Sequence, residues 1–263
     1  MFLLVDKPLG WSSFDVVAHL KHRLPPLAGG PKKRKIGHGG TLDPGATGVL
    51  IIATDTDTKK LATLLAGRKR YRASFERGRM TDTRDTYPRN FDQYYPPTQN
   101  GQGWLVNTKP QYPPSRYQRE GWLTSLHGHV TLPLPPFRAS KHHGQPVYKQ
   151  ARKQGFDPTM IPESKESFIY HISPLTYEGG IWALDLEVSG GTYIRSLAWL
   201  AYTTFGIPCV MTSLVRTGVS TMRGRRTLHT PGEIYTTDKL TYRIIEVPSD
   251  AHILTTPLLS HSS

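Results

Sequence analysis

The chain has 263 residues, 37% of them hydrophobic, which is enough for one large domain with a substantial core. The formal net charge of +13 favours a polyanionic partner such as a nucleic acid, although it also suits general solubility. A single cysteine excludes an internal disulfide, and no apolar run reaches the roughly 20 residues of a membrane span, so we expect a soluble intracellular protein of the nucleus, cytoplasm or mitochondrion.

Taken in chain order, the first elements that the sequence predicts are a short strand over residues 2–5 and a helix capped by Ser12 or Ser13. The stretch AGGPKKRK that follows the helix is typical of a flexible basic loop. GVLIIAT then predicts a buried strand, and TKKLATLLAG predicts a helix that begins with a Thr58 cap and ends at Gly67.

The second half mixes strand and helix patterns without a regular beat. RYRASFE and IWALDLEVS alternate between apolar and polar side chains, so each predicts a half-buried strand. TYIRSLAWLAYTTFG predicts a helix that ends at Gly206. Residues 87–121 are rich in Tyr, Pro, Gln, Asn and Gly and predict a long surface excursion. Together these patterns favour an α+β fold over a doubly wound sheet.

The carboxylate of Asp43 stands out in GHGGTLDPGATGVL, residues 37–50. A charge placed against a buried strand is costly without a partner, and the Asp-Pro step presents the side chain in a turn. The glycines fit neither a phosphate-binding loop, which needs Gly-Lys-Ser/Thr, nor a dinucleotide motif, which opens a helix after a strand. Asp43 is therefore either a functional acid or a residue that caps its own turn.

Three further segments favour a functional role for this acid. Arg195 in GGTYIRSL stands at the start of the predicted helix, carries a permanent charge and can pair with Asp43. Tyr71 has a ring suited to stacking on a base, or to ordinary strand packing. SLVRTGVS contributes Leu214, Arg216 and Thr217, or is an ordinary strand.

Six blocks of the sequence, in order, resemble motifs of the TruB family of pseudouridine synthases, which act on the T-loop uridine of tRNA. VDKPLGWSS resembles the first motif and GHGGTLDPGATGVL the second, catalytic one. KRYRASFERGRMTDTRD resembles the segment with the active-site Tyr and a later Thr-Asp-Thr-x-Asp, and KHHGQPVYKQAR resembles Lys-x-x-Gly-x-x-x-Tyr-x-x-Ala-Arg. GGTYIRSL resembles the third motif and LVRT the closing one, so the resemblance spans residues 5–220.

The resemblance implies the pseudouridine synthase fold, a mixed and mostly antiparallel sheet flanked by helices and loops around a central catalytic cleft. It makes Asp43 the catalytic aspartate, paired with Arg195, and it has Tyr71 stack on the target uracil and assist proton removal. Leu214 would wall the uracil pocket, and His38 would hold the extruded base. The further substrate-binding positions are Gly39, Gly40, Thr41, Leu42, Tyr193 and Lys7, the last as a support of the catalytic loop.

An RNA partner also needs cations for its phosphates, and each basic side chain has the alternative of being a solvated surface charge. The PKKRK run is either an RNA-contacting loop or a nuclear address. The candidate phosphate contacts are Lys32, Lys33, Arg34, Lys35, Arg68, Lys69 and Arg70.

The implied reaction adds no atoms to uridine, because the bond from C1′ to N1 breaks, the base turns, and C5 joins C1′. It therefore needs no metal, nucleotide or redox cofactor. The target uridine must be flipped out of a folded RNA loop. An ionised Asp43, kept charged by a neighbouring guanidinium, either attacks the sugar or removes the C2′ proton.

The implied catalytic domain covers residues 1–222, with 87–121 as a loop insertion. Residues 223–263 form a C-terminal extension too short for the full RNA-binding PUA domain that many family members carry. LPPFRASKHH departs from the family pattern, and Gly45 replaces an apolar residue at the strand entry. The expected partner is the T-arm of tRNA, or another RNA with a T-loop-like hairpin, bound by a monomer away from any membrane.

Two alternatives stay open for the sequence alone. One is an RNA-binding, tRNA-folding protein of the same fold with little or no catalysis, against which the catalytic side chains argue. The other is a metal-dependent hydrolase whose ligands, at a spacing that fits no standard metal site, would be His38, Asp43, Asp82 and Asp85.

Overall fold

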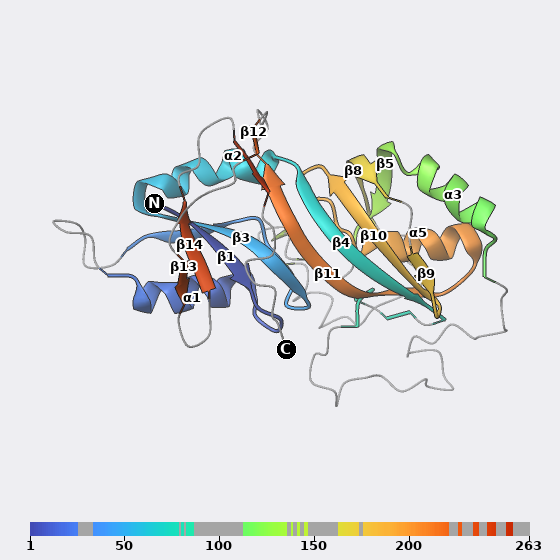
Figure 1. The fold of residues 1–263 in the computed structure, drawn as a ribbon, viewed down its shortest axis with the longest axis horizontal. Coiled ribbons are helices and arrows are strands. Elements are labelled where there is room, and N and C mark those ends of the chain that lie inside the picture. The colour runs from blue at the N-terminus through green and yellow to red at the C-terminus, as the bar shows by residue number, and fades with distance from the viewer. Residues whose placement is uncertain are drawn as a thin grey trace. The chain divides into compact units, whose positions relative to one another are not determined.

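The chain forms two compact units. Unit 1 comprises residues Met1–Arg72, Ser189–Gly191 and Leu214–Ser263, and unit 2 comprises Ala73–Val188 and Thr192–Ser213. Two strands, β4 (Lys69–Arg77) and β11 (Cys209–Ser220), each run from one unit into the other (Figure 1). The computed structural model describes residues 1–25, 34–78, 80–81, 83–86, 113–135, 138, 141–142, 145–146, 163–173, 176–220, 226–227, 234–236, 241–245 and 251–254.

Unit 1 is built on a sheet with the strand order β13-β14-β1-β3-β11, to which β2 adds on β3. Most neighbours are antiparallel, but β3 and β11 run parallel, with Leu214 beside Ala46 and Arg216 beside Gly48. The remaining strands are β1 (Phe2–Lys7), β2 (Ile36–Gly39), β3 (Ala46–Thr54), β12 (Arg226–Thr227), β13 (Ile234–Thr236), β14 (Thr241–Ile245) and β15 (Ala251–Leu254).

Both faces of this sheet are covered, which explains why its strands are almost continuously apolar. On one face, Leu3 and Leu50 pack against Val16 and Leu20 of helix α1 (Ser13–Arg23). The other face packs against Leu61, where the 3-10 helix η1 (Asp55–Lys60) leads into α2 (Leu61–Ala66). Figure 1 shows α1 and α2 on opposite sides of β1 and β3.

Helix α1 begins where the sequence predicts. Ser12 is its N-cap, and the Ser12 hydroxyl accepts the N–H of Asp15 while the Asp15 carboxylate accepts the N–H of Ser12. Such a reciprocal capping box satisfies two backbone donors that a helix start leaves open. It fixes the entry into α1, whose first residue, Ser13, forms hydrogen bonds with Leu42.

Unit 2 carries the strand order β11-β4-β10-β8-β5, with β9 added on β10. The alternating patterns of β4 and β10 predicted from the sequence are confirmed, since every second side chain is buried. The other elements are β5 (Gly128–Pro133), the hairpin β6 (Lys141–His142) and β7 (Gln145–Pro146), β8 (Ser164–Ile172), β9 (Thr176–Glu178), β10 (Ile181–Val188), α3 (Arg116–Ser125) and α5 (Ser196–Phe205).

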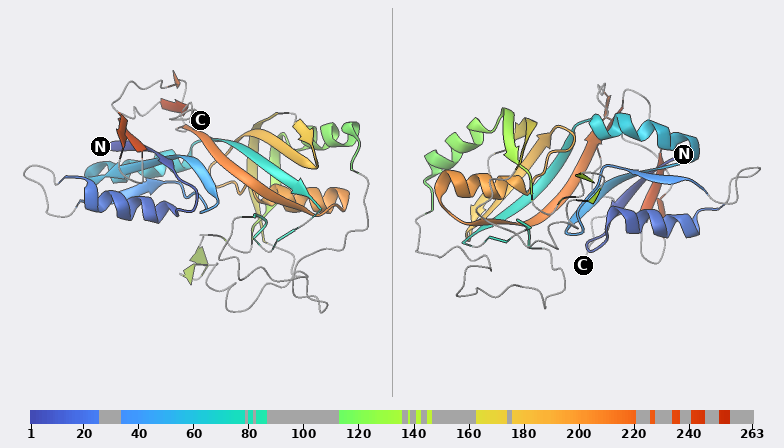
Figure 2. Two further views of the ribbon diagram at one scale, coloured as in Figure 1. Left: turned by 60° about the horizontal axis from the view of Figure 1, so that its bottom comes forward. Right: turned by 180° about the vertical axis from the view of Figure 1, so that it is seen from behind.

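Helices α3 and α5 cover one face of this sheet (Figure 2). Trp122 of α3, Trp182 of β10 and Phe205 of α5 meet edge to face, with ring centroids 5.6 to 6.1 Å apart. Edge-to-face contacts suit the charge distribution of aromatic rings and add to the burial of apolar area. This aromatic cluster holds α5, and therefore the start of α5, firmly on the sheet.

Two expectations differ from the observed elements. The helix predicted to begin with a Thr58 cap is preceded by 3-10 turns from Asp55, and the Thr58 hydroxyl donates back to the Asp55 carbonyl. The excursion predicted for 87–121 ends sooner, because α3 begins at Arg116, and its residues 87–112 lie outside the described part. The stretch 223–263 supplies β14 and β15 to the sheet of unit 1, so its treatment as a separate extension stays a prediction.

Among the described residues, no helix has the length and apolar character that crossing a bilayer requires.

Candidate active site

Asp43 lies in the turn that leads from β2 into β3. The Asp43 carbonyl accepts the N–H of Ala46, the first residue of β3, at 3.0 Å, and the residue is half-buried. Leu214 pairs with Ala46 in the parallel ladder, so the closing motif of the sequence lies directly beside this turn. The structure therefore brings together two of the predicted site residues, the acid and the wall of the pocket, within unit 1.

The residues on both sides of Asp43 are held by the first motif. The hydroxyl of Ser13 accepts the N–H of Leu42 at 2.8 Å and donates to the Leu42 carbonyl at 3.3 Å. The N–H of Gly10 donates to the Pro44 carbonyl at 2.9 Å. The carboxylate of Asp43 is thus presented by a backbone whose neighbouring peptide groups are already fixed, which limits the entropy lost when substrate binds.

Lys7 is fully buried and acts on the main chain. Its ammonium group donates to the carbonyls of Pro8 at 2.9 Å and Trp11 at 2.6 Å. Burial lowers the pKa of Lys7 to about 8, although the negative charge of Asp43 raises it part of the way back. These bonds shape the turn that carries Gly10, and the role of Lys7 as a support of the catalytic loop stays a prediction.

Arg216 is a site residue to which the sequence analysis gave no role. It is buried in β11, and its guanidinium donates from Nε to the Val49 carbonyl at 2.7 Å and from Nη2 to the Gly40 carbonyl at 3.1 Å. These two carbonyls lie on either side of Asp43 in the sequence, so one side chain holds both ends of residues 40–49, the segment that contains Asp43. The signal that could have identified Arg216 is the alternation of the strand, which buries it on the same face as Leu214.

His38 lies on β2, where it pairs with Ile52 of β3. Burial, and then the positive charge of Arg216, lower the pKa of His38 below its usual value of 6.5. Its Nδ1 is buried and has no hydrogen-bond partner among the described residues. A neutral imidazole is therefore the form that the site carries at physiological pH.

Tyr71 and its neighbours follow from the alternation of β4. Tyr71 is 6% exposed and Lys69, two residues earlier on the same face, is 4% exposed, with its ammonium group donating to the Gly67 carbonyl at 3.2 Å. The expected contact of Lys69 with RNA phosphates therefore conflicts with its burial, and a structural role suits it better. Leu42, Gly39 and Gly40 are buried, and Thr41 is exposed.

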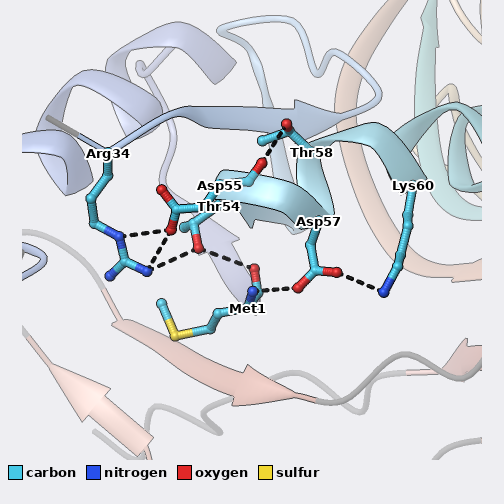
Figure 3. A network of polar contacts seen from close by, with 7 residues as sticks. All are labelled: Met1, Arg34, Thr54, Asp55, Asp57, Thr58 and Lys60. Atoms are coloured by element: carbon cyan, nitrogen blue, oxygen red, sulfur yellow. Dashed lines mark hydrogen bonds and ion pairs between the residues drawn. The ribbon is translucent and has the colours of Figure 1, made fainter. Parts of the chain in front are cut away.

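The other candidate cations divide by their surroundings. Lys32 and Lys33 lie outside the described residues. The guanidinium of Arg34 donates to the Asp55 carboxylate at 2.8 and 3.0 Å and to the Thr54 hydroxyl at 3.1 Å, within a network that includes the Met1 amine (Figure 3). Of the candidate cations that the structure describes, Lys35, Arg68 and Arg70 are exposed.

Arg195 belongs to unit 2, where it is the N-cap residue of α5 and not part of its first turn. It is 2% exposed, and its Nη1 donates to the Thr83 carbonyl at 2.6 Å while its Nε lies 3.6 Å from the Asp85 carboxylate. Asp43 lies in unit 1, so the expected pairing of Asp43 with Arg195 stays a prediction. Tyr193, two residues before Arg195, is half-buried.

The Thr-Asp-Thr-x-Asp turn is built around Asp85. The hydroxyl of Thr83 donates to the Asp85 carboxylate at 2.8 Å, and the hydroxyl of Thr81 donates to the Asp85 carbonyl at 2.8 Å. The backbone of Asp85 also forms an isolated parallel β-bridge with Met211 of β11. The sequence analysis considered Asp85 only as a metal ligand, whereas the structure makes it an ion-pair partner of Arg195.

The alternative metal site has no support from grouped ligands in the described part of the chain. No three His, Cys, Asp or Glu side chains gather there closely enough to hold a metal ion. Asp82, one of the four ligands considered, lies outside the described residues.

Solved structures share this fold. A Cbf5–Nop10–Gar1 complex matches with a TM-score of 0.55 and 23% identity over 83% of this chain and 49% of that chain. An H/ACA RNP bound to a substrate RNA containing 2′-deoxyuridine matches with a TM-score of 0.51 and 23% identity, over 82% and 46%. The chain spans about half the length of these solved chains. The expected α+β pseudouridine synthase fold is confirmed.

Comparisons with known sequences show to which protein family this chain belongs. The model of the TruB family pseudouridylate synthase N-terminal domain matches residues 30–194. The tRNA pseudouridine synthase B of Chlorobium luteolum is 34% identical over 222 residues, 84% of this chain and 70% of that relative. That of Flavobacterium johnsoniae is 36% identical, over 75% and 78%. The human pseudouridylate synthase TRUB1 is 34% identical, over 73% and 53%. The chain belongs to the TruB family of pseudouridine synthases.

Proposed function

We propose that this protein isomerises a uridine in tRNA to pseudouridine, and that the uridine lies in the T-loop. Its family and the names of its relatives support a tRNA pseudouridine synthase. The observation that carries the assignment of the acid is the fixation of the Asp43 turn by Ser13, Gly10 and Arg216, all from outside that turn. Main-chain atoms tied this tightly are typical of a segment that must present one side chain in one orientation.

The chemistry then follows from the groups available. The Asp43 carboxylate acts on the ribose of a flipped uridine as the bond from C1′ to N1 breaks. The base turns, C5 joins C1′, and the proton that leaves C5 is replaced by one taken up at N1, so that substrate and product have the same composition. Tyr71 and Leu214 supply an aromatic face and an apolar wall for the base, and Arg195 supplies positive charge that favours the ionised acid.

Partners beyond the T-loop uridine are part of the same proposal. The protein acts as a monomer on the T-arm of tRNA and on hairpins of similar shape. The exposed cations Lys35, Arg68 and Arg70, and the basic run that begins at Lys32, contact phosphates and make binding dependent on salt.

The test replaces the acid by its amide. Purified wild-type protein and the Asp43→Asn variant are incubated with an unmodified tRNA transcript, and pseudouridine is mapped at single-nucleotide resolution. We expect wild-type protein to modify one T-loop position, and Asp43→Asn to form no product while its Kd for tRNA changes less than about threefold. Glu120→Gln on the exposed face of α3 is the matched carboxylate control.

Each outcome has a distinct meaning. Turnover by Asp43→Asn at a rate comparable to wild type would show that the acid is wrongly assigned. Tight binding of tRNA by a wild-type protein that forms no pseudouridine would replace the enzyme by an RNA-binding protein of the same fold. Modification at a position outside the T-loop would keep the activity and overturn the substrate site.

A further inference from the structure

A single main-chain carbonyl in unit 2 joins the turn after β4 to the start of α5. The carbonyl oxygen of Pro133, the last residue of β5, accepts from Arg84 Nη1 at 3.1 Å and from the Ser196 hydroxyl at 2.6 Å. Ser196 directly follows Arg195, and Arg84 stands between Thr83 and Asp85, the two residues that contact Arg195. The Pro133 carbonyl therefore links Ser196, next to Arg195 in the chain, to Arg84, which lies between the two residues that contact Arg195.

The side chain of Arg84 is held a second time, from α5. Its guanidinium carbon lies 4.9 Å from the centre of the Trp199 ring, a distance at which a cation is attracted to an aromatic face. Trp199 is four residues after Arg195, so it rises from α5 one turn above it. Arg84 is only 2% exposed, and a guanidinium removed from water gains more from such a contact than an exposed one does.

The backbone of Arg84 adopts an unfavourable conformation, which these side-chain contacts help to hold. Its φ is +64°, in the left-handed region that a non-glycine residue enters only at an energetic cost. The N–H of Arg84 donates to the Thr81 carbonyl at 3.1 Å, and its carbonyl accepts from the Met211 N–H at 3.0 Å. The result is a tight turn in which the carbonyl before Arg84 and the carboxylate after it both contact one guanidinium.

Two arginine side chains are thus buried near each other. Burial, and then the charge of Arg195, lower the pKa of Arg84 to about 10, so Arg84 is still charged at physiological pH. Placing two like charges together in a core is unfavourable unless each is held by its own acceptors. Arg84 has the Pro133 carbonyl and the Trp199 ring, while Arg195 has the Thr83 carbonyl and Asp85.

We infer that Arg84 is a positioning residue for Arg195. Clamped between Pro133 and Trp199, Arg84 holds the turn whose Thr83 carbonyl and Asp85 carboxylate orient the Arg195 guanidinium for the isomerisation. The inference rests on the proposed function, because Arg195 matters only if the protein is a catalyst. Arg84 fills the variable position of the Thr-Asp-Thr-x-Asp motif, so the role comes from the contacts of this chain and not from the motif.

The experiment measures the single-turnover rate constant with enzyme in saturating excess over tRNA. This rate constant reports the reaction of bound RNA and is insensitive to the fraction of enzyme that is unfolded. The variants are Arg84→Met, which keeps the length of the side chain without its charge, Trp199→Leu, which removes the ring, and the double variant. Arg116→Met is the matched control, because the side chain of Arg116 is 85% exposed on α3 of the same unit.

We expect Arg84→Met and Trp199→Leu each to lower the rate constant about tenfold or more, with the Kd for tRNA changed less than about twofold. The double variant should lose no more than the worse single variant, since the two side chains form one contact. Arg116→Met should match wild type. A rate constant unchanged in Arg84→Met, whatever the change in Tm, would reduce Arg84 to a purely structural residue and overturn the inference.

Milder substitutions cover the case in which these variants do not fold. Trp199→Phe keeps a ring face, and we expect a rate constant within about threefold of wild type, whereas Arg84→Lys keeps the charge without the planar fork and should fall between wild type and Arg84→Met. Wild-type rates in Arg84→Lys together with a loss in Trp199→Phe would contradict the clamp. Failure of wild-type protein to form pseudouridine would instead refute the proposed function itself, so the two failures are distinguishable.

Discussion

A Cβ atom added to Gly48 would lie 2.3 Å from the carbonyl oxygen of Arg216, because the two residues face each other in the parallel ladder of β3 and β11. Gly48 also has a φ of +93°, which side chains rarely permit. Both reasons restrict this position to glycine. Because the two backbones lie this close, the Arg216 side chain reaches the carbonyls of Gly40 and Val49, on either side of Asp43. The backbone contact at Gly48 and these two hydrogen bonds therefore depend on each other.

Gly48→Ala should therefore destabilise the protein by more than about 2 kcal/mol, since conformational strain and steric overlap add. The matched control is Gly78→Ala, because Gly78 has a similar φ of +99° but no atom within 4 Å of an added Cβ. The control should cost only about 1 kcal/mol, the strain alone. Urea unfolding of both variants checks this, and equal losses would show that the contact with Arg216 is not restrictive.

Removing the guanidinium of Arg216 should loosen residues 40–49, the segment that contains Asp43. In Arg216→Met the buried carbonyls of Gly40 and Val49 each lose a donor, at a cost of about 1–3 kcal/mol per group. The variant also removes a positive charge that lowers the pKa of His38, so this pKa should rise towards 6.5. NMR titration of His38 measures the second effect separately from stability, and an unchanged pKa would contradict the electrostatic contact.

Asp85→Asn should impair the reaction without weakening tRNA binding. The variant removes the negative charge 3.6 Å from Arg195 and keeps the shape of the side chain. We expect the single-turnover rate constant to fall about tenfold or more, since an arginine without its partner is less well oriented. Glu178→Gln, an exposed carboxylate in the same unit, is the control. A rate constant equal to wild type would remove Asp85 from the site.

Acid should weaken unit 1 through the network of Figure 3. Burial acts to raise the pKa of Asp55, but hydrogen bonds from Arg34 and Thr54 outweigh it and hold that pKa below 3.8. Hydrogen bonds from Lys60 and the Met1 amine likewise lower the pKa of Asp57. Folded-state pKa values below the unfolded ones contribute stability that is present above about pH 4 and is lost as pH falls through the folded values.

The measurement for this network is Tm as a function of pH, for wild type and for Asp57→Asn. Wild type should lose more Tm than the variant between about pH 4 and pH 2, because the variant lacks one of the groups that must protonate. Parallel curves for the two proteins would show that Asp57 contributes nothing to acid sensitivity.

Two lysines should separate phosphate contacts from structural charges. Lys35 is exposed, so Lys35→Ala should weaken tRNA binding and reduce the slope of log K against log salt by about 1. Lys69 is buried, so Lys69→Met should lower Tm and leave that slope unchanged. Salt titrations of tRNA affinity for both variants provide the check, and a reduced slope for Lys69→Met would restore Lys69 as an RNA contact.

The elements with strong local patterns could be predicted from the sequence. The alternation of β4 and β10 and the cap of α1 are set by neighbouring residues, and all three agree with the structure. The start of the helix after β3 was missed because Asp55 adopts a positive φ of 56°, which propensity does not foresee, and 3-10 turns follow it.

The candidate site was predicted in part. Asp43, Tyr71 and Arg195, for which we propose the roles of acid, stacking ring and cation, stand in sequence motifs, but the contacts that support them cannot be read from those motifs. Arg216 reaches Gly40 from far along the chain, and Arg84 meets Pro133 and Trp199 only once β5 and α5 are packed. Such contacts are made by tertiary packing, which leaves no periodicity in the sequence. The burial of Lys69 could have been predicted, because the alternation that buries Tyr71 applies to it equally.

Strand β1 pairs with β3 on one side and with β14 on the other. Figure 1 shows these blue and red segments together in unit 1, although residues 8–240 separate them in the sequence. During synthesis on the ribosome, β1 therefore emerges with this edge unpaired and stays so until residues 241–245 have been translated. An unpaired edge of this kind can pair with other chains, so the pairing of β1 with β14 removes a site of association as well as completing the sheet of unit 1.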